Sequence, residues 1–213
     1  MRIKLLLLSI FCIGLFIYVS YHVAKERWTK IDFDTTVKLQ DRIPGRFDKY
    51  FSYLSLIGSA EITLGFCLIM VFLSLIKLKW LPILGWLMII PASMAEVFGK
   101  LVLFHPAPPV FLHRTLLPTG LPSFYIHTNF SYPSGHMTRT AFIVTILICV
   151  IFFRKTYLGK LIGIPILLTL AFFMGLTRIY LGEHWTSDVI GGLILGAGMG
   201  FFASVLILSA KKV

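Results

Sequence analysis

The polar stretch at residues 177–188 reads Thr-Arg-Ile-Tyr-Leu-Gly-Glu-His-Trp-Thr-Ser-Asp and separates two hydrophobic runs. Each run is long enough to cross a membrane as a helix. Arg178, His184 and Asp188 would supply an anion clamp, a nucleophile or base, and a carboxylate that orients the histidine. The alternative is an ordinary interfacial loop whose polar residues cap helices. The stretch alone does not decide between the two.

Composition places the chain among integral membrane proteins. Of its 213 residues, 57% are hydrophobic and only 14% are charged, which excludes an ordinary soluble domain. The net charge of +11 comes from basic residues scattered between apolar runs, so we expect membrane lipids as partners and no nucleic acid. Cys12, Cys67 and Cys149 lie in apolar runs without metal-type spacing and are expected to be small buried hydrophobes.

Six hydrophobic runs predict an all-α fold, a polytopic membrane helical bundle that forms a single domain over residues 1–213. The first run follows Arg2 and Lys4, as in a signal peptide, but it lacks a clear small-x-small cleavage site. We therefore interpret it as an uncleaved helix. The spans are expected at about residues 5–24, 51–76, 80–104, 137–153, 158–176 and 189–208.

Two segments between the spans differ in composition. Residues 25–50 mix seven basic with five acidic residues and several apolar ones, as in an amphipathic segment at the membrane surface. Residues 105–132 are rich in proline and predict a loop long enough to cover a site. In the last span Gly192, Gly196 and Gly200 recur every four residues, a spacing that favours close helix packing and not chemistry.

Basic residues indicate the orientation of the bundle. Six spans place both termini on one side, and the termini and two turns on that side carry nine basic residues and no acid. Cytoplasmic loops are enriched in Lys and Arg, so we expect this side to be cytoplasmic, in a bacterial plasma membrane. Residues 25–50 are basic as well, which weakens the argument. The proline-rich loop and the 177–188 stretch would then meet on the extracytoplasmic face.

Polar groups at the outer helix ends suit a phosphate. Ser134 and Gly135 lead into a helix and offer a hydroxyl and free backbone N–H groups at the positive end of the helix dipole. Lys100 and Arg178 would add positive charge to the same oxygens. Taken singly, each group has a structural explanation, as an interfacial lysine or a helix cap.

The two histidines near these groups suit different roles. His184 and Asp188 are four residues apart, one helical turn, so the carboxylate would hold one imidazole nitrogen and leave the other to attack. His136 would lie opposite and protonate the departing oxygen.

At these positions the sequence resembles the type 2 phosphatidic acid phosphatase superfamily. Pro-Ser-Gly-His at residues 133–136 resembles the second motif of that family. Arg178, His184 and Asp188, with five and three residues between them, resemble its third motif. That motif usually begins Ser-Arg, whereas here Thr177 precedes the arginine.

The first motif of the family, a Lys, six residues and then Arg-Pro, is only partly present. Lys100 and the proline fit, but Ala107 stands where the family has Arg. Charge stabilisation is often the largest catalytic effect, so the loss would slow turnover unless another cation serves. We hypothesise that one of three side chains does so, namely Arg139, Arg114 or His105. For Arg139 the alternative is an ion pair with Glu61 or Glu96.

The resemblance implies dephosphorylation of a lipid phosphate through a phosphohistidine, without a metal or another cofactor. It implies that His184 is the nucleophile, Asp188 its partner and His136 the general acid. The residues that it implies for phosphate binding are Lys100, Ser134, Gly135 and Arg178.

The predicted activity is hydrolysis of a lipid phosphomonoester or pyrophosphate at the outer membrane interface. Undecaprenyl pyrophosphate, phosphatidylglycerophosphate, phosphatidic acid and lipid-linked sugar phosphates all fit, and the sequence does not rank them. A lipid phosphotransferase with the same intermediate is one alternative. A catalytically weak lipid-phosphate binder or transporter is another, which Ala107 permits. A homo-oligomer is compatible with the sequence.

Overall fold

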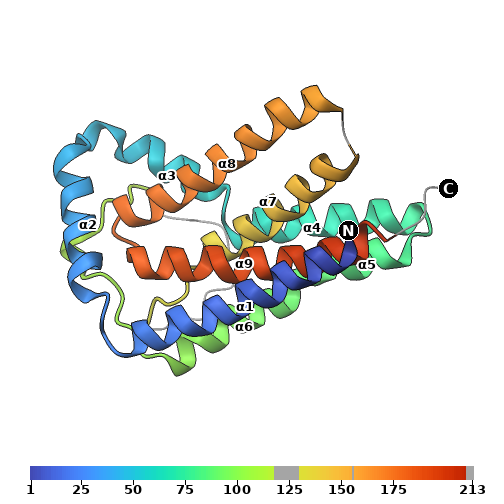
Figure 1. Ribbon diagram of the computed structural model, residues 1–213. Coiled ribbons are helices and arrows are strands. Elements are labelled where there is room, and N and C mark those ends of the chain that lie inside the picture. Colours follow the sequence, from blue (N-terminus) through green and yellow to red (C-terminus); the bar gives the residue numbers. More distant parts are fainter. Residues whose placement is uncertain (118–129, 155, 210–213) are drawn as a thin grey trace.

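The protein is all helical in its computed structural model, which describes residues 1–117, 130–154 and 156–209 (Figure 1). The middle of the proline-rich loop and the basic residues Lys155, Lys211 and Lys212 lie outside the described residues. Apart from an isolated bridge between Pro106 and Phe130, the described residues contain no β-structure. The helices are α1 (Arg2–Ala24), α2 (Thr29–Arg42), η1 (Gly45–Phe47), α3 (Asp48–Leu56), α4 (Ala60–Ile76), α5 (Trp80–Leu87), α6 (Ile89–Val102), η2 (Val110–Leu112), α7 (Gly135–Arg154), α8 (Tyr157–Tyr180) and α9 (Thr186–Ile207).

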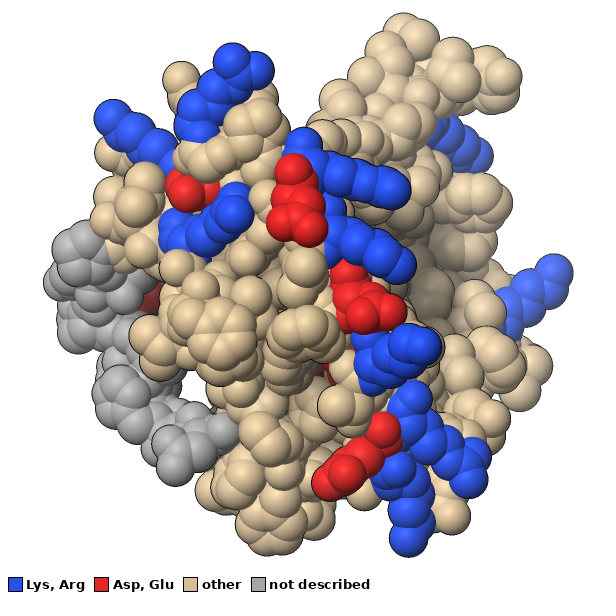
Figure 2. All heavy atoms as spheres, turned by 90° about the vertical axis from the view of Figure 1, so that its left-hand side faces the viewer, with Lys and Arg blue, Asp and Glu red and all other residues tan. Residues whose placement is uncertain are grey.

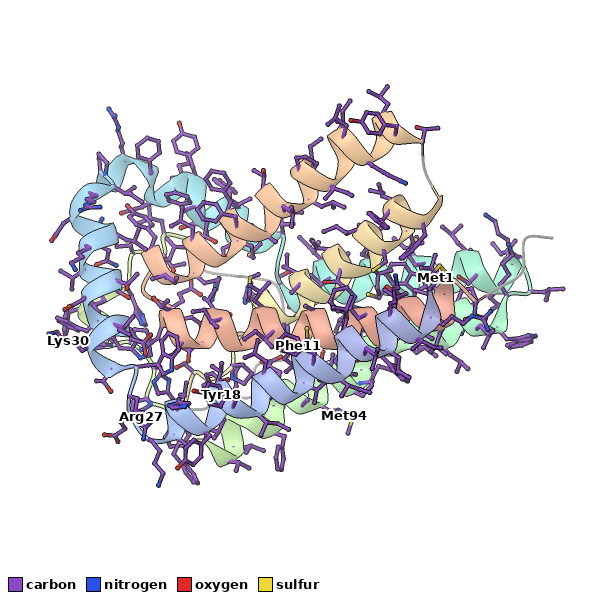
Figure 3. The ribbon with its side chains drawn as sticks, viewed as in Figure 1. Met1, Phe11, Tyr18, Arg27, Lys30 and Met94 are labelled. Atoms are coloured by element: carbon purple, nitrogen blue, oxygen red, sulfur yellow. The ribbon has the colours of Figure 1, made fainter. Side chains whose placement is uncertain are left out.

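Six helical segments are long and apolar enough to cross a membrane, which confirms the predicted all-α membrane bundle. Large apolar side chains cover its outside, as on α6, where Met94 is 66% exposed and points away from the bundle (Figure 3). The protein is therefore an integral membrane protein, and its outer side chains face lipid. The six segments are Arg2–Ala24, Gly45–Ile76, Trp80–Val102, Gly135–Phe153, Tyr157–Tyr180 and Thr186–Ile207.

The second and third spans are each interrupted, where the sequence predicted single helices. In the second, Ser59 starts α4 as its N-cap, and its hydroxyl accepts the N–H of Ile62 at 3.4 Å. In the third, α5 ends at Leu87, because Pro91 has no N–H to donate to the carbonyl group of that residue. Both interruptions follow from local sequence and not from loss of the apolar run.

The fifth and sixth spans extend into the 177–188 stretch, further than predicted. α8 continues to Tyr180 and α9 begins at Thr186, so the loop between them covers only residues 181–185. Polar side chains are costly in a membrane helix that faces lipid, so the sequence predicted that both helices stop at the polar stretch. In the structure these side chains are buried against protein: Arg178 is 3% exposed and Asp188 is 0% exposed.

Helix α9 lies in the middle of the bundle, between α7 and α1 (Figure 1). Its glycines allow α7 to approach closely. A Cβ atom on Gly192 would lie 2.5 Å from the carbonyl oxygen of Ser134, and one on Gly200 would lie 2.8 Å from that of Phe142. The glycine spacing therefore serves packing, as the sequence indicated.

The two ends of the bundle differ in character. At one end the start of α1 lies beside the end of α9, where the guanidinium group of Arg2 donates to the carbonyl oxygen of Ser209 at 3.3 Å. Helix α2 lies across the other end, where Arg27 and Lys30 are found (Figure 3). On this face Lys and Arg side chains, with Asp and Glu side chains between them, surround an apolar surface (Figure 2). This end has the composition of a segment that contacts lipid headgroups.

We expect Gly196→Ala to weaken the contact between α7 and α9. Its new methyl group would meet the backbone carbonyl of Thr138 and the side chain of Ala141, at 2.8 Å from the latter. Overpacking of this kind costs about 1–3 kcal/mol. The measurement is the midpoint of thermal unfolding in detergent. Gly65→Ala in α4 is the matched control, because nothing lies within 4 Å of its Cβ position. Equal midpoints for the two variants would contradict the prediction.

Candidate active site

The candidate site lies at the α2 end of the bundle, where the start of α7, the end of α8 and the start of α9 meet. Gly182 turns the chain between α8 and α9 with a φ of 68°, and a Cβ there would collide with the backbone of Leu112. Asp188 then fixes the start of α9, because its Oδ2 accepts the N–H of Trp185 at 2.9 Å. The 177–188 stretch is therefore held by its own local contacts.

His184 and Asp188 form the expected pair. The Nδ1 atom of His184 lies 3.3 Å from Oδ2 of Asp188, so the carboxylate holds this nitrogen in its protonated form and leaves Nε2 with a lone pair. Burial lowers the pKa of His184 below its usual value. The hydrogen bond to Asp188 acts in the opposite direction, and the charge of Arg178 adds to the lowering. A neutral imidazole at pH 7 follows, as an attacking nitrogen requires.

His136 lies in the first turn of α7 and lines a cavity of about 260 Å³. Arg178 and Glu183 line the same cavity, together with polar residues from α3 and the segment after η2. His184 is not part of this lining. The lining residues are Ser52, Ser55, Leu56, His113, Thr115, Leu117, His136, Arg178 and Glu183.

Buried donors at the site include groups that have no hydrogen-bond partner among the described residues. Two of them are the hydroxyl group of Ser134, a residue that is 0% exposed, and Nε of Arg178. The other guanidinium nitrogens of Arg178 donate to Ser55 and Glu183. Burial of an unsatisfied donor is costly, so both groups suit a ligand that brings acceptor oxygens.

Carboxylates accompany each of the cations expected at the site. Lys100 contacts Glu96, which lies one helical turn earlier on α6, at 2.7 Å. The Glu96 carboxylate also lies against the start of α7, where a Cβ on Gly135 would come within 2.5 Å of it. Arg178 is paired with Glu183, whose role the sequence did not reveal. Burial raises the pKa of Glu183, but Arg178, Thr115 and His184 together outweigh burial and hold that pKa below its usual value.

The three proposed substitutes for the missing arginine each contact other residues of the protein. Arg139 lies 3.0 Å from Glu96, so Glu96 and not Glu61 is its ion-pair partner. Arg114 lies over the ring of Tyr180, 5.4 Å from its centroid. His105 contacts Asp188. None of the three lines the cavity that Arg178 and His136 share. That one of them replaces the charge absent at Ala107 stays a prediction.

Metal ligation has no candidate within the part of the chain that the structure describes. In that part, no group of three or more His, Cys, Asp or Glu side chains could hold a metal ion. His184 and His105 are both bonded to the carboxylate of Asp188.

The fold is an all-helical bundle of six apolar spans, and the three motifs lie at one end of it. These features place the protein among the polytopic integral membrane proteins. Residues 8–211 match the PAP2 superfamily, and the chain therefore belongs to that superfamily. Phosphatidylglycerophosphatase B of Bacillus subtilis (strain 168) is 31% identical over 71 residues, which are 32% of this chain. The matched segment spans about a third of that relative, 35% of its length.

Two crystal structures share the fold. One is described as the first transmembrane PAP2 type phosphatidylglycerolphosphate phosphatase from Bacillus subtilis; it covers 92% of this chain and 93% of its own, with a TM-score of 0.73 and 18% identity. The other, Aquifex aeolicus LpxE, covers 81% of this chain and 94% of its own, with a TM-score of 0.60 and 21% identity. At these identities the likeness concerns the fold.

We expect Arg139→Met to lower stability more than turnover. Its ion pair with Glu96 is buried, and removing one partner of such a pair costs on the order of 3 kcal/mol. The measurements are the thermal midpoint in detergent and the turnover of the folded fraction. Glu96→Gln should lower the midpoint as well, and the double variant should lose less than the sum of the two. A normal midpoint with a many-fold lower turnover would instead assign Arg139 to the reaction.

Proposed function

We propose that the protein is a metal-independent lipid phosphatase that hydrolyses a phosphomonoester or pyrophosphate through a phosphohistidine. The observation that carries this proposal is the His184–Asp188 pair, 3.3 Å apart, next to buried donors that lack a partner among the described residues. A phosphoryl group offers acceptor oxygens for the hydroxyl of Ser134 and for Nε of Arg178. Membership of the PAP2 superfamily supports the same activity.

The first step would transfer the phosphoryl group to the enzyme. Nε2 of His184 attacks phosphorus, the bond from phosphorus to the ester oxygen breaks, and His136 gives its proton to that oxygen. Asp188 stabilises the positive charge that develops on His184, because its carboxylate accepts the Nδ1–H. Lys100 and Arg178 would stabilise the charge on the transferring oxygens.

The second step would release phosphate. A water molecule gives a proton to His136 while its oxygen attacks phosphorus, and the bond from phosphorus to Nε2 of His184 breaks. The electron pair returns to the imidazole, and His136 regains the proton that it used in the first step. Both histidines thus end each cycle as they began it.

The substrate is a lipid whose headgroup enters the site from the membrane. The relative of B. subtilis is named for phosphatidylglycerophosphate, which makes this lipid the first to test. The site lies at the end of the bundle opposite the meeting point of Arg2 and Ser209. With cytoplasmic termini, the reaction takes place on the extracytoplasmic face.

We expect purified protein in detergent to release phosphate from at least one lipid of a panel, with a chelator present. The panel contains phosphatidylglycerophosphate, phosphatidic acid, undecaprenyl pyrophosphate and a lipid-linked sugar phosphate. His184→Ala should abolish release, because the attacking nitrogen is lost. Release that His184→Ala retains would refute the nucleophile, and release that the chelator abolishes would refute the metal-free reaction. A new phospholipid in place of free phosphate would identify a phosphotransferase, and no release from any lipid would favour a binder.

The pH dependence of kcat/KM should reflect the neutral state of His184. Burial lowers the pKa of this imidazole, so its attacking form persists below the usual histidine value of about 6.5. As the pH falls, kcat/KM should stay constant until the pH is below about 6.5. It should decline only when the pH passes through the lowered pKa of His184. Samples returned to pH 7 should recover, which separates titration from unfolding. An acid limb centred above about 6.5 would contradict the prediction.

A further inference from the structure

The carboxylate of Asp188 contacts a second histidine besides His184. The Nδ1 atom of His105 lies 3.0 Å from Oδ1 of Asp188, while His184 and the N–H of Trp185 occupy Oδ2. Both oxygens of this fully buried carboxylate are therefore held. His105 lies 83 residues from Asp188 in the chain and reaches it from the segment that follows α6.

His105 is itself held in place by its surroundings. Its carbonyl oxygen accepts the N–H of Ser131 at 2.9 Å, and the indole N–H of Trp185 donates to the next carbonyl, that of Pro106, at 2.8 Å. Its ring packs edge-on against Tyr132, with 6.3 Å between the centroids. Only 10% of its side chain is exposed. This is a fixed position and not that of a surface histidine.

A second buried carboxylate lies behind His105. Oδ2 of Asp32, from α2, is 3.9 Å from Nε2 of His105. Asp32 accepts the N–H and the hydroxyl of Ser187, each at 2.8 Å, which ties α2 to the first turn of α9. His105 therefore lies between two acids, one of which orients His184.

The surroundings favour the charged form of His105. Burial lowers its pKa, but the acids that face it outweigh burial and raise the pKa above its usual value. These acids are Asp188 from α9, Asp32 from α2 and Glu26 between α1 and α2. His184 shares Asp188 with His105, yet its pKa shifts in the opposite direction.

We propose that His105 is a positioning residue, which donates its Nδ1–H to Asp188 and so keeps the other carboxylate oxygen aligned with His184. This role rests on the proposed function, in which His184 attacks the phosphoryl group. It differs from binding of the substrate phosphate, because His105 acts through Asp188. Without this donor, one oxygen of the buried carboxylate is unsatisfied and can turn away from His184.

The test compares two amides at position 105. In His105→Asn the amide nitrogen takes the place of Nδ1 and still donates to Asp188, whereas in His105→Gln it takes the place of Nε2 and faces Asp32. We expect His105→Gln and His105→Leu to lower kcat by about 10- to 100-fold, the usual effect of losing an outer hydrogen-bond partner. His105→Asn should stay within a few-fold of the wild type. KM and the inhibition constant of inorganic phosphate should not change in any of the three.

The comparison with controls separates this role from the alternatives. His22→Leu, at a histidine on α1 whose ring contacts Arg27 and Tyr18, should leave kcat unchanged. Equal values of kcat in His105→Asn and His105→Gln would overturn the proposal. So would a rise in KM and in the phosphate inhibition constant at constant kcat, which would make His105 a phosphate-binding cation. Loss of activity in His184→Ala alongside normal kcat in His105→Leu would refute the positioning role and leave the proposed function intact.

A readout that needs no turnover tests His105 even if the protein hydrolyses none of the lipids. In protein labelled with 15N-histidine, the signal that is absent from His184→Ala belongs to His184. We expect this signal to shift in His105→Gln and to keep its wild-type position in His105→Asn. An unchanged signal in His105→Gln would overturn the proposal.

Discussion

The buried carboxyl group of Asp188 is the constraint on which the rest of the site depends. Its side chain binds His184 and His105, and its backbone oxygen accepts the N–H of Ser134 at 3.0 Å. These three partners come from the three motif segments, which are far apart in the chain. A charge that is 0% exposed is tolerated only when donors surround it, so the segments must stay together for the fold to persist.

The close contact between α7 and α9 makes that arrangement possible. Ser134 can reach Asp188 only because the start of α7 lies against α9, where Gly192 leaves room for the Ser134 carbonyl. The same region admits Glu96 beside Gly135. Small residues thus determine how near the polar groups come to one another, although they carry no chemistry. Packing and site geometry are therefore one property of this bundle.

The sequence predicted what depends on local patterns and missed what depends on distant contacts. Long apolar runs predicted six spans, and one-turn spacing predicted the contact of His184 with Asp188. The contact of His105 with Asp188 joins residues 83 apart, for which no local pattern exists. The predicted end of the fifth span and the predicted start of the sixth both stop short of the polar residues that α8 and α9 include. The reason is that composition does not show which polar side chains are buried against protein. The catalytic roles of these residues stay predictions.

The carboxylates beside Lys100 and Arg178 bear on how a cycle would end. Glu96 and Glu183 are the ion-pair partners of these cations. A departing phosphate ion would therefore leave behind two ready counter-ions, and no bare positive charge would remain in a medium of low dielectric constant. Cations hold a doubly charged product tightly, because the attraction grows with charge and is weakly screened in such a medium. In the proposed reaction, Glu96 and Glu183 would compete with this product for the two cations and so favour its release.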